Sequence, residues 1–193
     1  VCGKGPEAAA LTALARYTIR ADADARPPAA VLERLNAAVL AQVGDMRFLT
    51  AVCARLRPGD DGVAGSLARG GHPPALLARA DGDVELLLPD GPLVGVLQSS
   101  SNAELPFHLR PGDALVLFSD GVSEARGPEG ELFGVERLAD VVAANAGRDA
   151  EGMARAIGDA VEEFGPDGPQ DDVALLVVRA AGADGTVRAA AAP

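Results

Sequence analysis

ALVLFSDG, residues 114–121, is an apolar run that ends abruptly in a carboxylate followed by glycine. Such a run, bounded by a turn signal, predicts a buried strand over its apolar part. An ionised carboxylate at the end of a buried strand is costly unless a partner compensates its charge. Because the neighbouring sequence offers little Lys or Arg, a divalent cation is the simplest partner for Asp120. This stretch therefore predicts metal-dependent chemistry.

A second acidic stretch stands in the same relation to an apolar run near the end of the sequence. Asp171 and Asp172 directly precede VALLVV, residues 173–178, which predicts another core strand. Asp is common in turns, so each acidic stretch by itself also fits an ordinary junction between elements. Together, at the ends of the two most apolar strands, they favour a shared cation site. Oxygen ligands without His or Cys select Mg²⁺ or Mn²⁺ over Zn²⁺.

Length and composition narrow the class of protein. The 193 residues suffice for one domain, and the formal net charge of −11 argues against nucleic acid or an anionic membrane surface as a partner. Cys2 and Cys53 lack metal-ligand spacing and indicate reduced thiols in a cytoplasmic protein. No apolar stretch reaches about 18 residues, so we expect no transmembrane helix. The start at Val1 has no signal-peptide pattern and is expected to lie inside a domain.

The order of predicted elements indicates an α+β fold, not alternating βαβ units. Helices are predicted over residues 8–20, 31–40, 132–145 and 151–164, and strands over 48–56, 63–69, 75–80, 84–88, 105–109, 115–119 and 173–179. We expect residues 105–109 to pair with 115–119 through the turn at 110–113. The Ala/Gly-rich tail, residues 180–193, is predicted to be disordered.

Other catalytic classes lack their motifs. GKGPEA, residues 3–8, matches a dinucleotide fingerprint variant, but a break and a second helix follow where a Rossmann unit needs a strand. It remains a glycine turn at a helix start, which would either approach a phosphate or serve only as a turn. Cysteine-phosphatase chemistry is excluded, since the residues six positions after the two cysteines are Ala8 and Gly59. His72 and His108 are the only histidines, which excludes a His-rich zinc site.

Five short motifs follow one another in a recognisable order: Val1–Ala9 (VCGKGPEAA), Gly71–Pro74 (GHPP), Gly91–Gly95 (GPLVG), Leu117–Ala125 (LFSDGVSEA) and Asp171–Val173 (DDV). In this order they resemble the SpoIIE/RsbU-type PPM (PP2C-like) serine/threonine phosphatases. The resemblance covers residues 1–179 and implies one phosphatase domain over that range. It implies an α-β-β-α sandwich with a two-metal site at one edge of the paired sheets.

The resemblance also implies which residues bind metal. Asp120 matches the metal aspartate of the Asp-Gly motif, and Asp171 matches that of the terminal motif, with Asp172 as its neighbour. Of these last two, we expect Asp171 to bind directly. The family's first motif reads Gly-Asp-Val-x-Gly-x-Gly, and this sequence begins at its Val, so Val1 would offer a main-chain carbonyl. The bridging Asp of that motif and the strands before it are absent from this sequence, which implies a domain lacking its N-terminal strands.

The function implied by the resemblance is hydrolysis of phosphoserine by a metal-activated water, with no catalytic side chain as nucleophile. Two Mn²⁺ or Mg²⁺ ions are expected in the complete domain. The implied substrate is a phosphorylated anti-sigma-factor antagonist of the STAS type, and a homodimer formed through an upstream linker is a further expectation. The alternative is a non-catalytic, degenerate or truncated phosphatase that acts as a protein-interaction module. A structural Ca²⁺-binding domain fits poorly, because the acids do not follow the EF-hand pattern.

Overall fold

The computed structural model of the chain describes residues 1–22, 25–42, 48–99, 101–165, 168, 171–181 and 187–192. The chain divides into two compact units, of which the first comprises Val1–Leu56, Gly65–His72 and Leu88–Phe107, and the second comprises Arg57–Ala64, Pro73–Leu87 and His108–Pro193. The elements in chain order are α1 (Pro6–Asp22), α2 (Pro28–Gln42), β1 (Ala51–Gly59), β2 (Gly62–Gly70), β3 (Ala75–Ala78), β4 (Val84–Leu87), β5 (Glu104–Leu109), β6 (Ala114–Phe118), α3 (Asp120–Ser123), α4 (Gly134–Ala144), α5 (Ala150–Phe164), β7 (Leu175–Ala180) and β8 (Val187–Ala192). The predicted α+β class is confirmed.

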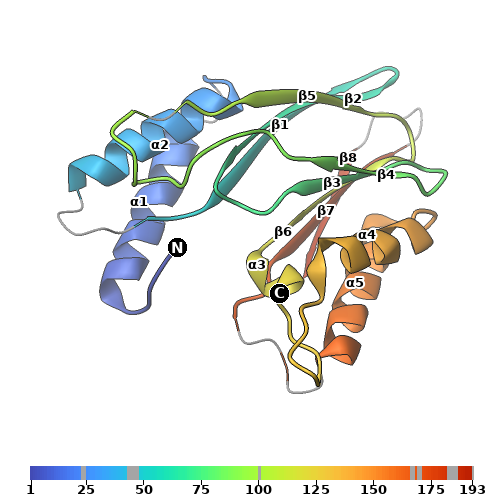
Figure 1. Ribbon diagram of the computed structural model, residues 1–193. Helices are drawn as coiled ribbons and strands as arrows, with labels where there is room; N and C mark the ends of the chain where they lie inside the picture. The colour runs from blue at the N-terminus through green and yellow to red at the C-terminus, as the bar shows by residue number, and fades with distance from the viewer. Residues whose placement is uncertain are drawn as a thin grey trace. The chain divides into compact units, whose positions relative to one another are not determined.

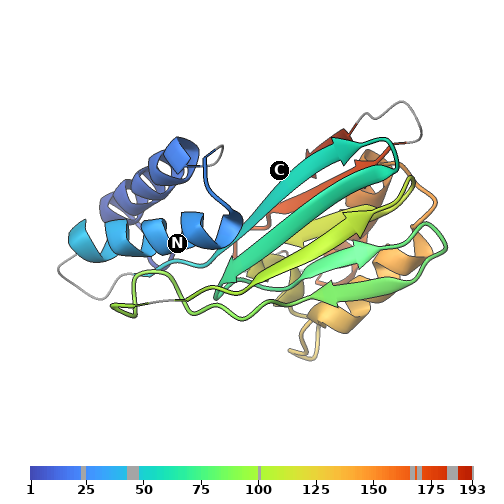
Figure 2. The ribbon, with the colours of Figure 1, turned by 90° about the horizontal axis from the view of Figure 1, so that it is seen from above.

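Helices α1 and α2 pack side by side in the first unit (Figure 1). Apolar residues at helical spacing give each helix a buried face, as the sequence pattern predicts. The shared core consists of Leu11, Leu32, Leu35, Val39, Leu49, Ala68 and Val94. The strands β1 and β2 are consecutive and lie with β5 in a three-stranded sheet of order β1-β2-β5 (Figure 2).

A buried carboxylate ties the end of α1 to α2. Asp22 accepts hydrogen bonds from Nε of Arg26 at 3.0 Å and from Nε of Arg34 at 2.6 Å. Burial by itself raises the pKa of the Asp22 carboxyl, but the hydrogen bonds from Arg34 and Arg26 outweigh it and hold the pKa below its ordinary value. The ionised form of Asp22 is therefore the form that stabilises the helix pair.

This clamp predicts how stability depends on pH. Because the folded-state pKa of Asp22 lies below the unfolded value, its contribution is present above about pH 4 and is lost as pH falls through the folded-state pKa. Asp22→Asn is expected to lower the free energy of unfolding at neutral pH and to flatten its dependence on pH in the acid range. Urea unfolding measured from neutral to acid pH checks this. Glu33→Gln, on the exposed side of α2, is the control and should keep the wild-type dependence.

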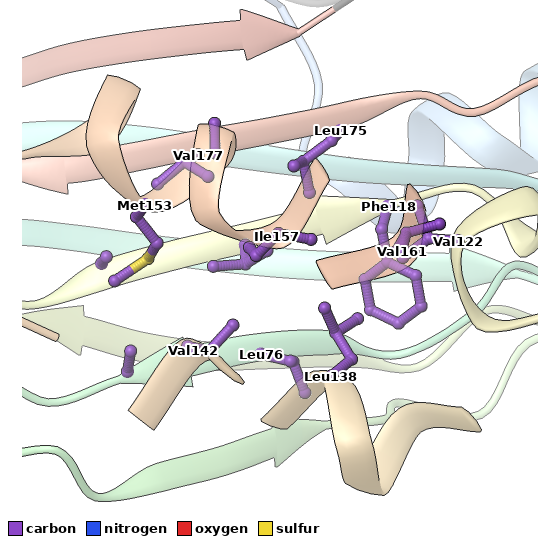
Figure 3. Close-up of a cluster of buried hydrophobic side chains, with 14 of the residues drawn as sticks. Leu76, Phe118, Val122, Leu138, Val142, Met153, Ile157, Val161, Leu175 and Val177 are labelled. Atoms are coloured by element: carbon purple, nitrogen blue, oxygen red, sulfur yellow. The ribbon is translucent and has the colours of Figure 1, made fainter. Parts of the chain in front are cut away.

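The second unit is built on a five-stranded antiparallel sheet of order β4-β3-β6-β7-β8. Helices α4 and α5 lie on one face of this sheet (Figure 1). Their apolar faces meet the side chains of β3, β6 and β7 in one core (Figure 3), which includes Leu76, Phe118, Val122, Leu138, Val142, Met153, Ile157, Val161, Leu175 and Val177. The strand β6 is central and almost wholly buried, as its apolar run predicts.

One predicted strand pairing is wrong. Residues 105–109 were expected to form a hairpin with 115–119, but β5 pairs with β2, whereas β6 lies between β3 and β7. The physical reason lies in burial: Leu115 and Val116 are fully buried, so the main-chain N–H and C=O groups of β6 need a partner strand on each side. The strand β5 has the half-exposed pattern of an edge strand. Local turn chemistry at residues 110–113 did not reveal this choice, since pairing between strands is decided by burial over the whole unit.

The prediction of a disordered tail is also wrong for part of residues 180–193. Residues 187–192 form β8, which pairs with β7 along its length, from Leu175 opposite Ala192 to Ala180 opposite Val187. This pairing is made by main-chain hydrogen bonds. Disorder was predicted from side-chain composition, and main-chain hydrogen bonds do not depend on that composition. Residues 182–186 and 193 lie outside the described residues.

Candidate metal site

Asp120 lies at the point where the central strand ends and a short helix begins. The strand β6 ends at Phe118, Ser119 is extended, and Asp120 opens α3. The sequence also allowed a simple strand-to-turn junction here, but the structure has a short helical turn, with Val122 in the core at 1% exposure. The Asp120 side chain itself is exposed, and its Oδ1 accepts the Gly121 N–H at 3.0 Å.

Ser119 brings the Asp120 segment beside the second acidic stretch. Its Oγ donates to the main-chain oxygen of Asp172 at 2.9 Å and accepts from the Ala174 N–H at 2.8 Å. The Ser119 N–H also donates to the Ala174 oxygen at 2.9 Å. The two acidic stretches, which are about 50 residues apart in sequence, are therefore neighbours at one end of β6 and β7, as their positions at strand ends led us to expect.

Gly121 allows the main chains of the two stretches to approach closely. A Cβ placed on Gly121 would lie 2.6 Å from the Asp172 oxygen and 3.2 Å from the Asp171 oxygen, distances that no side chain tolerates without a shift. The glycine after Asp120 therefore has a steric role, which the sequence pattern of a strand followed by Asp-Gly did not reveal.

Gly121→Ala is accordingly expected to displace the segment that carries Asp171 and Asp172. The overpacked contact should cost about 1–3 kcal/mol in the free energy of unfolding, and Mn²⁺ should bind more weakly. Thermal unfolding and calorimetric titration with Mn²⁺ check both effects. The control is Gly158→Ala in α5, where nothing lies within 4 Å of the new Cβ. A Gly121→Ala protein as stable as wild type would contradict the close approach.

The donors at this position fit a hard divalent cation as part of its ligand set. Asp120, Asp171 and Asp172 are all exposed carboxylates, and none of them forms an ion pair with Lys or Arg within the described ranges. Mg²⁺ and Mn²⁺ take such oxygen ligands, often completed by water. The described residues contain no group of three or more His, Cys, Asp or Glu side chains placed to hold an ion. The ligand roles of the three aspartates thus stay predictions.

Val1 belongs to the first compact unit, whereas Asp120, Asp171 and Asp172 belong to the second. It is 46% exposed, and the next residue, Cys2, donates its N–H to the Phe48 oxygen at 3.1 Å. The role of Val1 also stays a prediction. Cys2 and Cys53 are both free thiols in the structure.

Comparison with known protein families shows to which family the chain belongs. The family model described as Stage II sporulation protein E (SpoIIE) matches residues 1–181, almost the whole chain. The chain belongs to the SpoIIE family. The resemblance predicted from the five motifs is therefore confirmed, and the PP2C-like fold is confirmed by solved structures.

Relatives of this SpoIIE-family chain include one phosphoserine phosphatase. The phosphoserine phosphatase RsbU of Bacillus subtilis is 29% identical over 185 residues, which cover 93% of this chain and 53% of RsbU. Protein IcfG of Synechocystis sp. is 34% identical over 80 residues, 42% of this chain and 13% of IcfG. The solved SiaA-PP2C domain of Pseudomonas aeruginosa has a TM-score of 0.76 at 25% identity and covers 92% of this chain and 72% of that domain.

The SpoIIE-family chain thus spans about half the length of RsbU and a small part of IcfG. Among its described helices, none combines the length and apolar character needed to cross a bilayer.

Proposed function

We propose that this SpoIIE-family domain is a metal-dependent protein-serine/threonine phosphatase that hydrolyses the phosphoserine of a regulatory protein. The observation that carries the proposal is the contact between the Asp120 and Asp171–Asp172 segments, held by Ser119 and Gly121, within a family that includes a phosphoserine phosphatase. Two carboxylate segments at one end of a sheet supply part of the oxygen donors that Mn²⁺ or Mg²⁺ takes.

In this proposal Asp120 and Asp171 hold the cation, with Asp172 beside them and the Val1 carbonyl as a further donor. The chemistry that a divalent cation supplies at such a site is activation of a water and polarisation of the phosphoryl group. The attacking group in this proposal is that water, and no protein side chain serves as the nucleophile. Hydrolysis then proceeds by in-line displacement with no phosphoenzyme.

We further propose a phosphorylated STAS-type anti-sigma-factor antagonist as the substrate, in the cytoplasm. The support is the family relationship with RsbU and the motif resemblance, together with the net charge of −11, which disfavours nucleic acid as a partner. A homodimer of the whole protein is part of the same proposal.

The second candidate function is a non-catalytic interaction module. It is favoured by one observation, the incomplete ligand set: within the described residues no three acidic, His or Cys side chains converge on one point.

One experiment separates the two candidates. Mn²⁺-dependent hydrolysis of p-nitrophenyl phosphate and of a phosphoserine-bearing antagonist protein is measured for this chain and for a form extended upstream of Val1. Turnover that needs Mn²⁺ and disappears with EDTA, in either form, supports the phosphatase. Turnover in neither form, with antagonist binding retained, would establish the interaction module instead.

A further inference from the structure

We propose that Ser119 is a positioning residue that sets the place of the metal-binding segment at Asp171. The inference rests on the proposed function, because it concerns the same site. It assigns to Ser119 no contact with substrate or with reacting atoms. Its role is to hold one ligand-bearing segment in register with the other.

The argument begins with where the strand ladder stops. The pairing of β6 with β7 ends at Phe118 opposite Leu175. Asp171 and Asp172 lie before β7, beyond the last ladder pair, so no strand register fixes their main chain. The Asp120 segment likewise lies past the end of β6. The β6–β7 pairing by itself would not hold the segments of Asp120 and Asp171 together, although the proposed metal site uses both carboxylates.

Beyond the end of the strand pairing, hydrogen bonds from the single residue Ser119 join the two segments. Its hydroxyl donates to the main-chain oxygen of Asp172 at 2.9 Å and accepts from the Ala174 N–H at 2.8 Å. It therefore binds the main chain on both sides of Val173. Its own N–H adds a bond to the Ala174 oxygen at 2.9 Å. A hydroxyl is both donor and acceptor, so one side chain can satisfy both groups. Alanine would keep only the main-chain bond.

The hydrogen bonds of Ser119 also act on Asp171, through the main chain that joins it to Asp172. The Asp172 N–H donates to Oδ1 of Asp171 at 2.8 Å. Because Ser119 binds the main-chain oxygen of the same residue, Asp172, the orientation of the Asp171 carboxylate is coupled to Ser119. On the other side, Ser119 directly precedes Asp120. One hydroxyl therefore couples the main chains that carry both predicted metal ligands, in the manner of groups that orient ligands from outside the metal's own shell.

The test compares Mn²⁺ affinity, by calorimetric titration, in the wild type and in Ser119→Ala, Ser119→Thr and Asp120→Asn. Ser119→Ala is expected to bind Mn²⁺ about tenfold more weakly, as loss of an orienting partner generally does. Ser119→Thr keeps the hydroxyl and should restore most of the affinity. Amide hydrogen exchange at Ala174, followed by NMR, should be faster in Ser119→Ala than in the wild type.

A general loss of stability is separated from positioning by Asp149→Ala. Asp149 caps α5 by accepting the Gly152 N–H at 2.8 Å, away from the carboxylate site, so this variant loses stability without touching the metal segments. It should bind Mn²⁺ as the wild type does.

The outcomes distinguish this inference from the proposed function. If Asp120→Asn weakens Mn²⁺ binding but Ser119→Ala behaves like Asp149→Ala, the positioning role is overturned while the metal site stands. If neither Asp120→Asn nor Ser119→Ala changes Mn²⁺ binding, the metal site is wrong, and the inference about Ser119 falls with it. Weakening in both, with rescue by Ser119→Thr, supports both.

Discussion

Asp120→Asn is expected to lower Mn²⁺-dependent phosphatase activity by roughly 100-fold or more. Loss of an orienting partner outside the metal's shell already costs about 10–100-fold in metal affinity or activity, so loss of a ligand carboxylate should cost at least as much. Asn keeps the size of the side chain, and its amide oxygen can still accept the Gly121 N–H that Asp120 binds. The folded state should therefore survive while the negative charge is lost. Turnover and calorimetric Mn²⁺ affinity are measured on the same protein.

The matched control for this variant is Asp140→Asn. Asp140 is an exposed aspartate on α4, outside the two acidic stretches, and the substitution removes the same charge. It should leave both turnover and Mn²⁺ affinity at wild-type values. Wild-type activity in Asp120→Asn would show that the metal site has been assigned to the wrong carboxylate. An equal loss in both variants would point instead to a general effect of charge.

Asp113→Ala should be among the most destabilising single substitutions in the second unit. The Asp113 side chain is only 3% exposed, and its Oδ2 accepts from Nη1 of Arg79 at 2.8 Å and from the Arg110 N–H at 3.0 Å. Its Oδ1 accepts the Ala80 N–H at 3.0 Å. The carboxylate therefore joins the end of β3 to the turn before β6. Removing it leaves the Ala80 and Arg110 N–H groups without their acceptor and takes the buried carboxylate from the Arg79 guanidinium, which keeps the His108 oxygen at 2.9 Å.

The expected loss is about 3–5 kcal/mol in the free energy of unfolding, as for other buried pairs broken on one side. Urea unfolding at neutral pH measures it. Glu85→Ala is the control, because Glu85 lies 3.5 Å from the same guanidinium but is 57% exposed. It should cost at most about 1 kcal/mol. A similar loss in both variants would mean that burial of Asp113 does not set its contribution.

Element type was largely predictable because its signals are local. The strand predicted over residues 115–119 lies within one residue of β6 at either end, and helical spacing over residues 151–164 predicts α5. The sequence predicted less well which strands pair with one another. The turn between β5 and β6 favours pairing these two strands, but the buried main chain of β6 requires β3 and β7 as its neighbours. The strand β8 was missed because its main-chain pairing leaves no mark in an Ala-rich composition.

The candidate site shows the same division. The sequence alone singled out Asp120, Asp171 and Asp172, because a carboxylate at the end of an apolar run is visible in contiguous residues. It also determined the SpoIIE-type motifs, which are contiguous residues. Only the tertiary structure decided that Ser119 grips the Asp172 and Ala174 main chain and that Gly121 has no room for a Cβ. Those roles are made by groups about 50 residues apart, and such contacts exist only once the strands that carry them have paired.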